Sequence, residues 1–239
     1  FRQRIAETGG GIGAHVSTFG DLYRSILEKI NGVLPIASSP LQHYILQDVV
    51  DTLAEQGQLI HFGSLRNMPG FFSVLHDSFS ELKRSLVYPE QFLEFSNKGT
   101  LAQQELAHLY TLYQDRLHEL NWADPEGLSW LAVEALEKHP EVAAYIRLLV
   151  VDGFDAFTEA QRRALHLLSQ QVNELLITFP GEYGSTRIAH RRFSDTLGEI
   201  IQDLKPAINL LSNTPFIPPD VLHLEKTIFE AGDKTIKNA

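Results

Sequence analysis

Apolar residues recur at helical spacing through most of the chain, and two short β-like runs follow this helical stretch. Between positions 63 and 139 the apolar residues return every three or four positions, which is the period of an amphipathic helix. The capping residues Asp124 and Thr158 mark two helix starts. The pattern predicts helices over about 21–30, 39–56, 69–85, 89–95, 101–120, 124–138, 158–171, 193–204 and 220–231.

The two β-like runs cover 145–151 and 174–179, and both are apolar and rich in residues that favour strands. Runs without polar alternation are typical of strands buried on both faces of a sheet. A strand, a helix and a second strand within roughly 35 residues predict a βαβ unit with parallel strands and a right-handed crossover. A further strand is expected over 14–18, before the first helix.

Strands on both sides of a helical stretch predict an α/β domain with a helical insertion. We expect residues 1–62 to form the first part of this domain and residues 63–140 to form the all-helical insertion. Residues 141–239 then complete the α/β part with its C-terminal helices.

Composition limits the chemistry of the chain. Its 239 residues are 44% hydrophobic and 21% charged, which is ordinary for a globular protein. The absence of cysteine excludes disulfides and thiolate metal sites within these residues and favours a cytoplasmic location. No stretch approaches the roughly 20 apolar residues of a membrane span, so we expect no membrane partner. The net charge of −10 means that any contact with nucleic acid depends on a local patch. Because Phe1 is not a methionine, we expect the chain to lie inside a longer gene product.

The candidate site with most chemical content is Asp152-Gly153, directly after the first β-like run. Nucleoside triphosphatases place an acidic residue at this end of a strand to hold Mg²⁺, and usually a second carboxylate next to it. Because Gly153 has no carboxylate, we interpret the pair as a degenerate Walker B-like site with no catalytic residue. The alternative is an ordinary turn, since Asp-Gly is a common turn pair.

Other catalytic patterns are missing from the sequence. The glycines at 9–13 are followed by Ala14 and no lysine, so they do not form a phosphate loop. The histidines show no helical zinc spacing, and no metal site is expected. Three arginines after the second β-like run, Arg187, Arg191 and Arg192, form a possible phosphate-contacting edge, and a solvated charged face is the alternative.

Taken in order, these segments resemble the N-terminal region of the AddB/RexB family, whose members are subunits of ATP-dependent helicase/nucleases. Residues 16–22 (VSTFGDL) resemble the strand–Thr-Phe–helix segment equivalent to motif Ia of superfamily 1 helicases. Residues 148–157 (LLVVDGFDAF), followed by Thr-Glu-Ala-Gln, resemble the family's Asp-Gly-Phe signature. Residues 69–83 and 106–124 resemble its helical insertion.

This resemblance implies an incomplete RecA-like, P-loop NTPase-type parallel sheet with a large all-helical insertion. It implies a helicase-like module without motor activity, acting as a scaffold and DNA-contacting element. Its partner would be a helicase–nuclease subunit, in a heterodimer that processes double-strand breaks for recombinational repair. ATP and Mg²⁺ would belong to the full-length parent, and this chain would hold no cofactor.

The resemblance assigns few residues. Ser17, Thr18 and Phe19 match the motif Ia position, which touches single-stranded DNA in active relatives. Asp152 matches the Mg²⁺-binding acid, and Gly153 stands where the catalytic glutamate would be. The phosphate loop is expected upstream of Phe1, and the second helicase-like domain and the nuclease after Ala239.

Two other functions fit parts of the pattern. A fragment of an active superfamily 1 helicase would need Asp-Glu at the strand end, where this sequence has Asp152-Gly153. The chain could instead be a helical protein-interaction module without a DNA role. In that case the match of its Asp-Gly-Phe stretch to the family signature would be due to chance.

Overall fold

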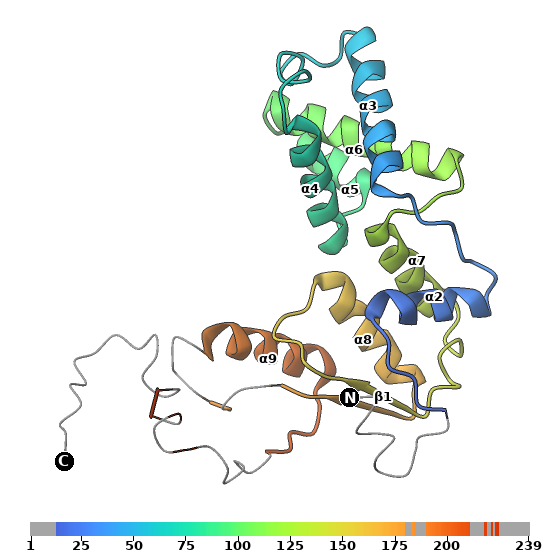
Figure 1. Ribbon diagram of the computed structural model, residues 1–239, viewed down its shortest axis with the longest axis vertical. Helices are drawn as coiled ribbons and strands as arrows, with labels where there is room; N and C mark the ends of the chain where they lie inside the picture. The colour runs from blue at the N-terminus through green and yellow to red at the C-terminus, as the bar shows by residue number, and fades with distance from the viewer. Residues whose placement is uncertain are drawn as a thin grey trace, which may run out of the picture.

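The computed structural model describes residues 13–179, 183–184, 190–210, 218, 221 and 223–224. Within these residues the fold is mostly helical, with a single pair of short strands (Figure 1). The helices are α2 (Phe19–Lys29), α3 (Ser39–Glu55), α4 (Phe71–Arg84), α5 (Pro89–Ser96), α6 (Leu101–Glu119), α7 (Pro125–Lys138), α8 (Glu159–Gln171) and α9 (Arg191–Leu204), and the strands are β1 (Leu148–Val151) and β2 (Glu174–Ile177).

The prediction of a RecA-like α/β sheet is wrong for the described residues, because β1 and β2 form a sheet of only two strands. The strand expected over 14–18 is absent. Its last residue, Thr18, is the N-cap of α2 with φ −91° and ψ 170°. An N-cap residue has extended backbone before its helix begins, so its sequence resembles a strand without needing a neighbouring strand.

The βαβ unit itself is confirmed. β1 and β2 pair in parallel, with Leu148 opposite Glu174 and Val151 opposite Ile177. The connecting helix α8 begins after Thr158, whose hydroxyl accepts a hydrogen bond from the backbone N–H of Gln161. The Gln161 side chain accepts in return from the backbone N–H of Thr158, which completes a capping box.

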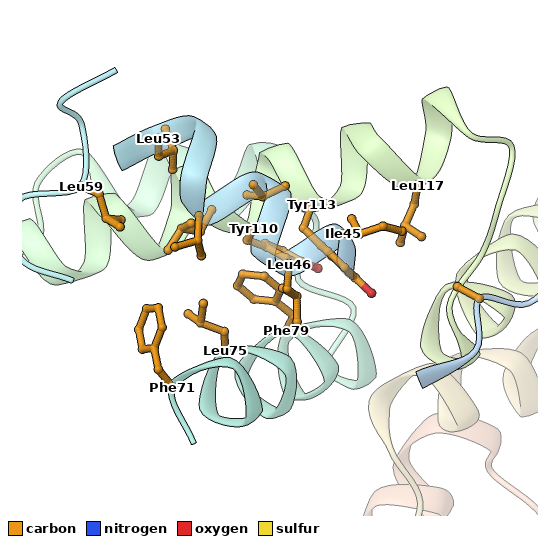
Figure 2. Packing of buried hydrophobic residues seen from close by; sticks show 14 of the residues in the cluster. Ile45, Leu46, Leu53, Leu59, Phe71, Leu75, Phe79, Tyr110, Tyr113 and Leu117 are labelled. Atoms are coloured by element: carbon orange, nitrogen blue, oxygen red, sulfur yellow. The ribbon is translucent and has the colours of Figure 1, made fainter. Parts of the chain in front are cut away.

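Helices α3, α4, α5 and α6 form a compact helical block, which lies far from the strands in Figure 1. Its centre is aromatic, with Phe79 packed against Tyr110 and Tyr113 at ring-centroid distances of 5.1 and 5.4 Å. Leu75 and Leu46 pack beside these rings (Figure 2). Burying these aliphatic and aromatic side chains stabilises the block by about 1.5–3 kcal/mol for each side chain.

A second core joins α2, α7 and α8. Tyr23 and Ile26 of α2 pack on Ala132 and Leu136 of α7, and Leu168 of α8 completes the contact. Helix α7 also sends Trp130 into the core of the helical block, so this one helix belongs to both cores. The division expected at 62 and 140 stays a prediction, although α3, assigned to the first part, packs within the helical block.

The two strands bury only one face. Leu149, Val151, Leu175 and Ile177 point toward the helices and pack in the cores beside α8 and α9. On the other face Leu148, Val150 and Leu176 are 53%, 42% and 45% exposed. The prediction that both faces are buried is therefore wrong for the described residues, because an apolar run alone does not say which surface a neighbour covers.

Candidate functional site

The Asp152-Gly153 pair lies where β1 ends, as the sequence predicts. Gly153 has φ +82°, a left-handed conformation that residues with a Cβ rarely adopt, and it turns the chain away from the strand. Asp152 accepts a hydrogen bond from the hydroxyl of Thr178, the residue that follows β2. The backbone N–H of Thr178 donates to Val151 O at 2.9 Å, so the two strand ends are held side by side.

Thr178 was not predicted as a site residue. A threonine that follows a strand carries no signal by itself. Only the pairing of Val151 with Ile177 places Thr178 next to Asp152. This register cannot be predicted from the sequence of either strand alone.

The predicted Walker B-like pair offers a single carboxylate. Asp152 is the acidic residue at the strand end, and its carboxylate is already bonded to Thr178. Gly153 adds no second carboxylate. Within the described part of the chain, no three His, Asp or Glu side chains lie close enough to share a metal ion.

The motif Ia-like segment is built around the start of α2. The Thr18 hydroxyl accepts from the Asp21 backbone N–H at 3.2 Å. Asp21 Oδ2 accepts from the Thr18 backbone N–H at 3.1 Å and from the Thr18 hydroxyl at 2.9 Å. The hydrogen bonds that the Asp21 carboxylate accepts hold the pKa of Asp21 below its ordinary value. The bond from the Thr18 backbone N–H has the largest effect, and the bond from the Thr18 hydroxyl has the next largest. Thr18 is thus the cap of α2, and Asp21 is its partner in a capping box.

Phe19 brings the two candidate segments together. Its ring meets Phe154, two residues after Asp152, with centroids 5.3 Å apart and an edge-to-face interplanar angle of 77°. It also meets Phe157 at 6.3 Å. The motif Ia-like segment and the Asp-Gly-Phe segment are therefore one structural unit in the described fold.

The contact continues as a row of five phenylalanine rings, which we call the aromatic row. Phe154 stacks on Phe157 at 5.3 Å, and Phe157 meets Phe179 at 6.1 Å. Phe179 then meets Phe193, near the start of α9, at 5.7 Å. All but Phe193 are partly exposed, and these four rings pack against the core around Val151 and Ile200, beyond the carboxyl ends of the two strands. The aromatic row consists of Phe19, Phe154, Phe157, Phe179 and Phe193.

Basic side chains lie at one end of the aromatic row. Arg191 and Arg192 open α9, directly before Phe193, and both are exposed. Arg192 is 72% exposed and forms a loose ion pair with Asp155 at 3.6 Å. Arg187, the third arginine of the predicted edge, lies outside the described residues.

The neighbouring Arg162 is held by internal ion pairs. Its guanidinium contacts Glu159 of its own helix at 2.6 Å and Glu199 of α9 at 2.7 Å. Burial disfavours its charge, but the hydrogen bond with Glu199 and the surrounding carboxylates outweigh burial and raise the pKa of Arg162. Arg162 therefore fastens α9 to α8 and is not free to contact a phosphate.

Two buried charged groups outside this edge were also not predicted. Lys83 is fully buried in the helical block and donates to Asp124 at 2.6 Å, with its ammonium 5.3 Å from the Trp130 ring centre. A signal for it exists, since Lys83 continues the apolar stripe of Leu75 and Phe79 at intervals of four. Burial lowers the pKa of Lys83, and Asp124 partly offsets this effect.

The second buried group is Glu105 of α6. Its carboxylate accepts from the backbone N–H groups of Ile60, His61 and Phe62 at 2.8, 2.6 and 2.9 Å. Three successive N–H groups on one carboxylate fix the connection between α3 and α4 to the side of α6. No signal in the sequence separates Glu105 from the exposed glutamates around it.

The described part of the chain holds a small cavity next to the buried ion pair of the helical block. A cavity of about 40 Å³ lies beside Lys83 and Asp124, lined also by Gln114 and Trp130. It has room for water molecules and not for a nucleotide.

None of the helices in the described part is long and apolar enough to cross a membrane.

The matches of this chain with known proteins agree on the same family. The family model described as "ADDB, N-terminal" matches residues 4–207. A protein of Alkaliphilus oremlandii (strain OhILAs) is 27% identical over 178 residues, which is 72% of this chain. One of Streptococcus uberis (strain ATCC BAA-854 / 0140J) is 26% identical over 204 residues, or 83% of this chain. Both are named as a subunit of an ATP-dependent helicase/deoxyribonuclease, and the matches span only 15% and 16% of their lengths.

Proposed function

Because this chain belongs to the AddB N-terminal family, we propose that it is a non-catalytic scaffold and DNA-contacting region of a helicase–nuclease subunit. In the intact protein this region works beside a partner subunit in the processing of double-strand DNA breaks. The word "subunit" in the names of the relatives supports an assembly with another chain.

The chemistry at the end of β1 supports a non-catalytic role. Activating water for hydrolysis needs a base next to the metal-binding acid. Gly153 has no side chain, and Asp152 is bonded to Thr178. In this arrangement the Asp152 side chain links the ends of β1 and β2, so its role is structural and not catalytic.

The aromatic row is the observation that supports contact with DNA. Single-stranded nucleic acid binds to proteins by stacking bases on aromatic rings and placing phosphates against basic side chains. Phe19, Phe154 and Phe157 form a partly exposed aromatic edge. Arg191 and Arg192 lie at the end of the row, where a phosphate backbone would run.

The net charge of −10 restricts this contact to the edge. Elsewhere the acidic surface repels phosphates, so binding is expected to be weak, local and sensitive to salt. Such a surface guides a strand that the partner subunit holds and does not bind duplex DNA broadly.

The test is a titration of a fluorescent single-stranded oligonucleotide with the 239-residue chain, followed by anisotropy. The double variant Arg191→Ala/Arg192→Ala should bind about 3- to 30-fold more weakly and reduce the slope of log K against log salt concentration by about 1.4. The matched control is Arg66→Ala/Lys98→Ala, which removes the same charge from exposed positions near the helical block. Equal losses in the two variants, or no binding by the unaltered chain, would contradict DNA contact at this edge.

A further inference from the structure

A shallow groove, which we call the α4–α6 groove, lies on the surface of the helical block. Its volume is about 470 Å³, and it is lined by Val74, Asp77, Ser78, Glu81 and Leu82 of α4 and by Leu106 of α6. From Val74 to Leu82 the groove follows α4 for about 12 Å, because an α-helix rises 1.5 Å per residue. The groove is therefore long enough for about two turns of a second helix lying beside α4.

The floor of the groove is apolar. Leu82 and Leu106 are partly buried and pack against the core of the helical block, so the floor is continuous with that core. Val74 is aliphatic and 63% exposed. The hydroxyl of Ser78 donates to Val74 O at 2.7 Å within its own helix, so it is satisfied without a ligand. Covering this floor removes apolar surface from water, which favours an occupant with aliphatic side chains.

Two carboxylates border the apolar floor. Asp77 and Glu81 are four residues apart on α4, so they lie on the same side of the helix. Both are exposed, and the Asp77 side chain is 83% accessible. Asp77 Oδ1 has a loose contact with Nδ1 of His76 at 3.4 Å. The rim of the groove is therefore acidic.

The basic residues that follow on α4 do not neutralise this rim. Lys83 is fully buried and pairs with Asp124 at 2.6 Å. Arg84 pairs with Glu126 of α7 at 2.8 Å. The groove thus combines an aliphatic floor with negative charge, which repels the phosphates of nucleic acid and attracts lysine or arginine.

We propose that the α4–α6 groove binds a basic amphipathic helix of another protein. Aliphatic side chains of that helix lie on Val74, Leu82 and Leu106, and its lysine or arginine side chains lie beside Asp77 and Glu81. An amphipathic helix in a groove is a common mode of recognition, with anchors spaced three and four residues apart. The argument for this occupant is complementarity of shape, polarity and charge. The proposal does not depend on contact between DNA and the aromatic row.

Three designed peptides of about 15 residues test the proposal by anisotropy with the 239-residue chain. The first has leucine at helical spacing on one side and lysine on the other. The second has glutamate in place of lysine, and the third has the composition of the first with leucine distributed around the helix. We expect the first peptide to bind at least about tenfold more tightly than either of the others.

Charge reversal in the groove separates a specific site from general attraction to an acidic protein. Asp77→Lys/Glu81→Lys should bind the lysine peptide about tenfold more weakly and the glutamate peptide more tightly than the unaltered chain does. The matched control, Asp51→Lys/Glu55→Lys, makes the same change at exposed positions of α3, with the same spacing and outside the groove. It should leave both affinities within about twofold at physiological salt.

A substitution in the floor tests the apolar contact. Val74→Ser should weaken binding of the lysine peptide at least about threefold, and circular dichroism checks that the helices persist. Equal effects of the groove and control variants, or equal binding of the lysine peptide and its redistributed version, would overturn the proposal. Sedimentation of the unaltered chain tests a second copy as the occupant. A dimer that Val74→Ser dissociates would assign the groove to self-association and also overturn the proposal.

Discussion

The rings of Phe19 and Phe154 meet edge to face, with centroids 5.3 Å apart, although one residue begins α2 and the other follows β1. This contact joins two segments that the sequence offers as separate candidate sites. It places the start of α2 directly against the loop that carries Asp152 and Gly153. The start of α2 and the loop after β1 are therefore in direct contact.

A double-mutant cycle measures this contact. Phe19→Leu and Phe154→Leu each keep an apolar side chain but remove the ring, so each should lower the free energy of unfolding. The double variant should lose less than the sum, with a coupling of about 0.5–1.5 kcal/mol, the usual value for an aromatic pair. Urea unfolding followed by circular dichroism gives these energies. Strict additivity would mean that the rings do not interact in solution.

The buried ion pair of Lys83 and Asp124 makes a second prediction. Lys83→Met leaves the Asp124 carboxylate buried without its cation, at a cost of about 3–5 kcal/mol. Adding Asp124→Asn should recover part of this loss, because the amide oxygen still accepts from the Gly127 backbone N–H as Asp124 Oδ1 does, at 2.6 Å.

The exposed pair Lys138–Glu134 is the control for that experiment. Its two side chains are 68% and 38% exposed, so Lys138→Met should lower the free energy of unfolding far less than Lys83→Met does. A cost for Lys83→Met as small as that of the control would contradict full burial of the Lys83 ammonium.

Buried tyrosines predict how stability depends on alkaline pH. Burial raises the pKa of Tyr23, Tyr110 and Tyr113 well above the ordinary value near 10. The unfolded chain therefore loses these protons first. Their contribution to stability is complete below pH 10 and falls as the pH rises beyond it, by up to about 1.4 kcal/mol per pH unit for each tyrosine. The lowered pKa of Lys83 has the opposite effect on the pH dependence of stability, but Lys83 is one group against three tyrosines.

The near-ultraviolet absorbance of tyrosinate follows this titration. The buried tyrosines Tyr23, Tyr110 and Tyr113 should ionise only as the chain unfolds. Tyr113→Phe should make the unfolding free energy less steep above pH 10. If all seven tyrosines ionise together with an ordinary pKa while the helices remain intact, the packing around Phe79 is not as described.

A change at the buried carboxylate of Glu105 should have a local effect on the connection between α3 and α4. In Glu105→Gln one acceptor oxygen becomes a donor that faces backbone N–H groups, which should cost about 1–3 kcal/mol. The amide protons of Ile60, His61 and Phe62 should then exchange faster with solvent. Hydrogen exchange measured by mass spectrometry checks this, with the exposed Glu94→Gln as the control. Unchanged exchange at these amides would show that the carboxylate does not hold the connection.

The sequence predicts the local structure of this protein better than its larger assembly. The starts of α7 and α8 follow from Asp124 and Thr158, because a capping side chain acts on backbone groups within a few residues. The parallel pairing of β1 with β2 follows from the short helix between them. In each case the cause and the effect lie close together in the chain.

The errors have a common physical origin. Residues 14–18 have a strand-like pattern, but a strand needs a partner, and the extended backbone of Thr18 serves as a helix cap. Runs such as Leu148–Val151 are apolar on both sides, yet one side is exposed among the described residues. Thr178, Lys83 and Glu105 act on residues distant in sequence, and a single sequence does not encode such pairings visibly.

Photochemical cross-linking tests most directly the contact that we propose between single-stranded DNA and the aromatic row. An oligonucleotide with a photoreactive iodinated uracil, which cross-links to aromatic side chains stacked on the base, is irradiated with the 239-residue chain. Mass spectrometry then identifies the linked peptides. We predict cross-links at Phe19, Phe154 or Phe157 that decrease with salt and are lost in Phe19→Leu/Phe154→Leu. Cross-links confined to the helical block, or unchanged in that variant, would contradict the account.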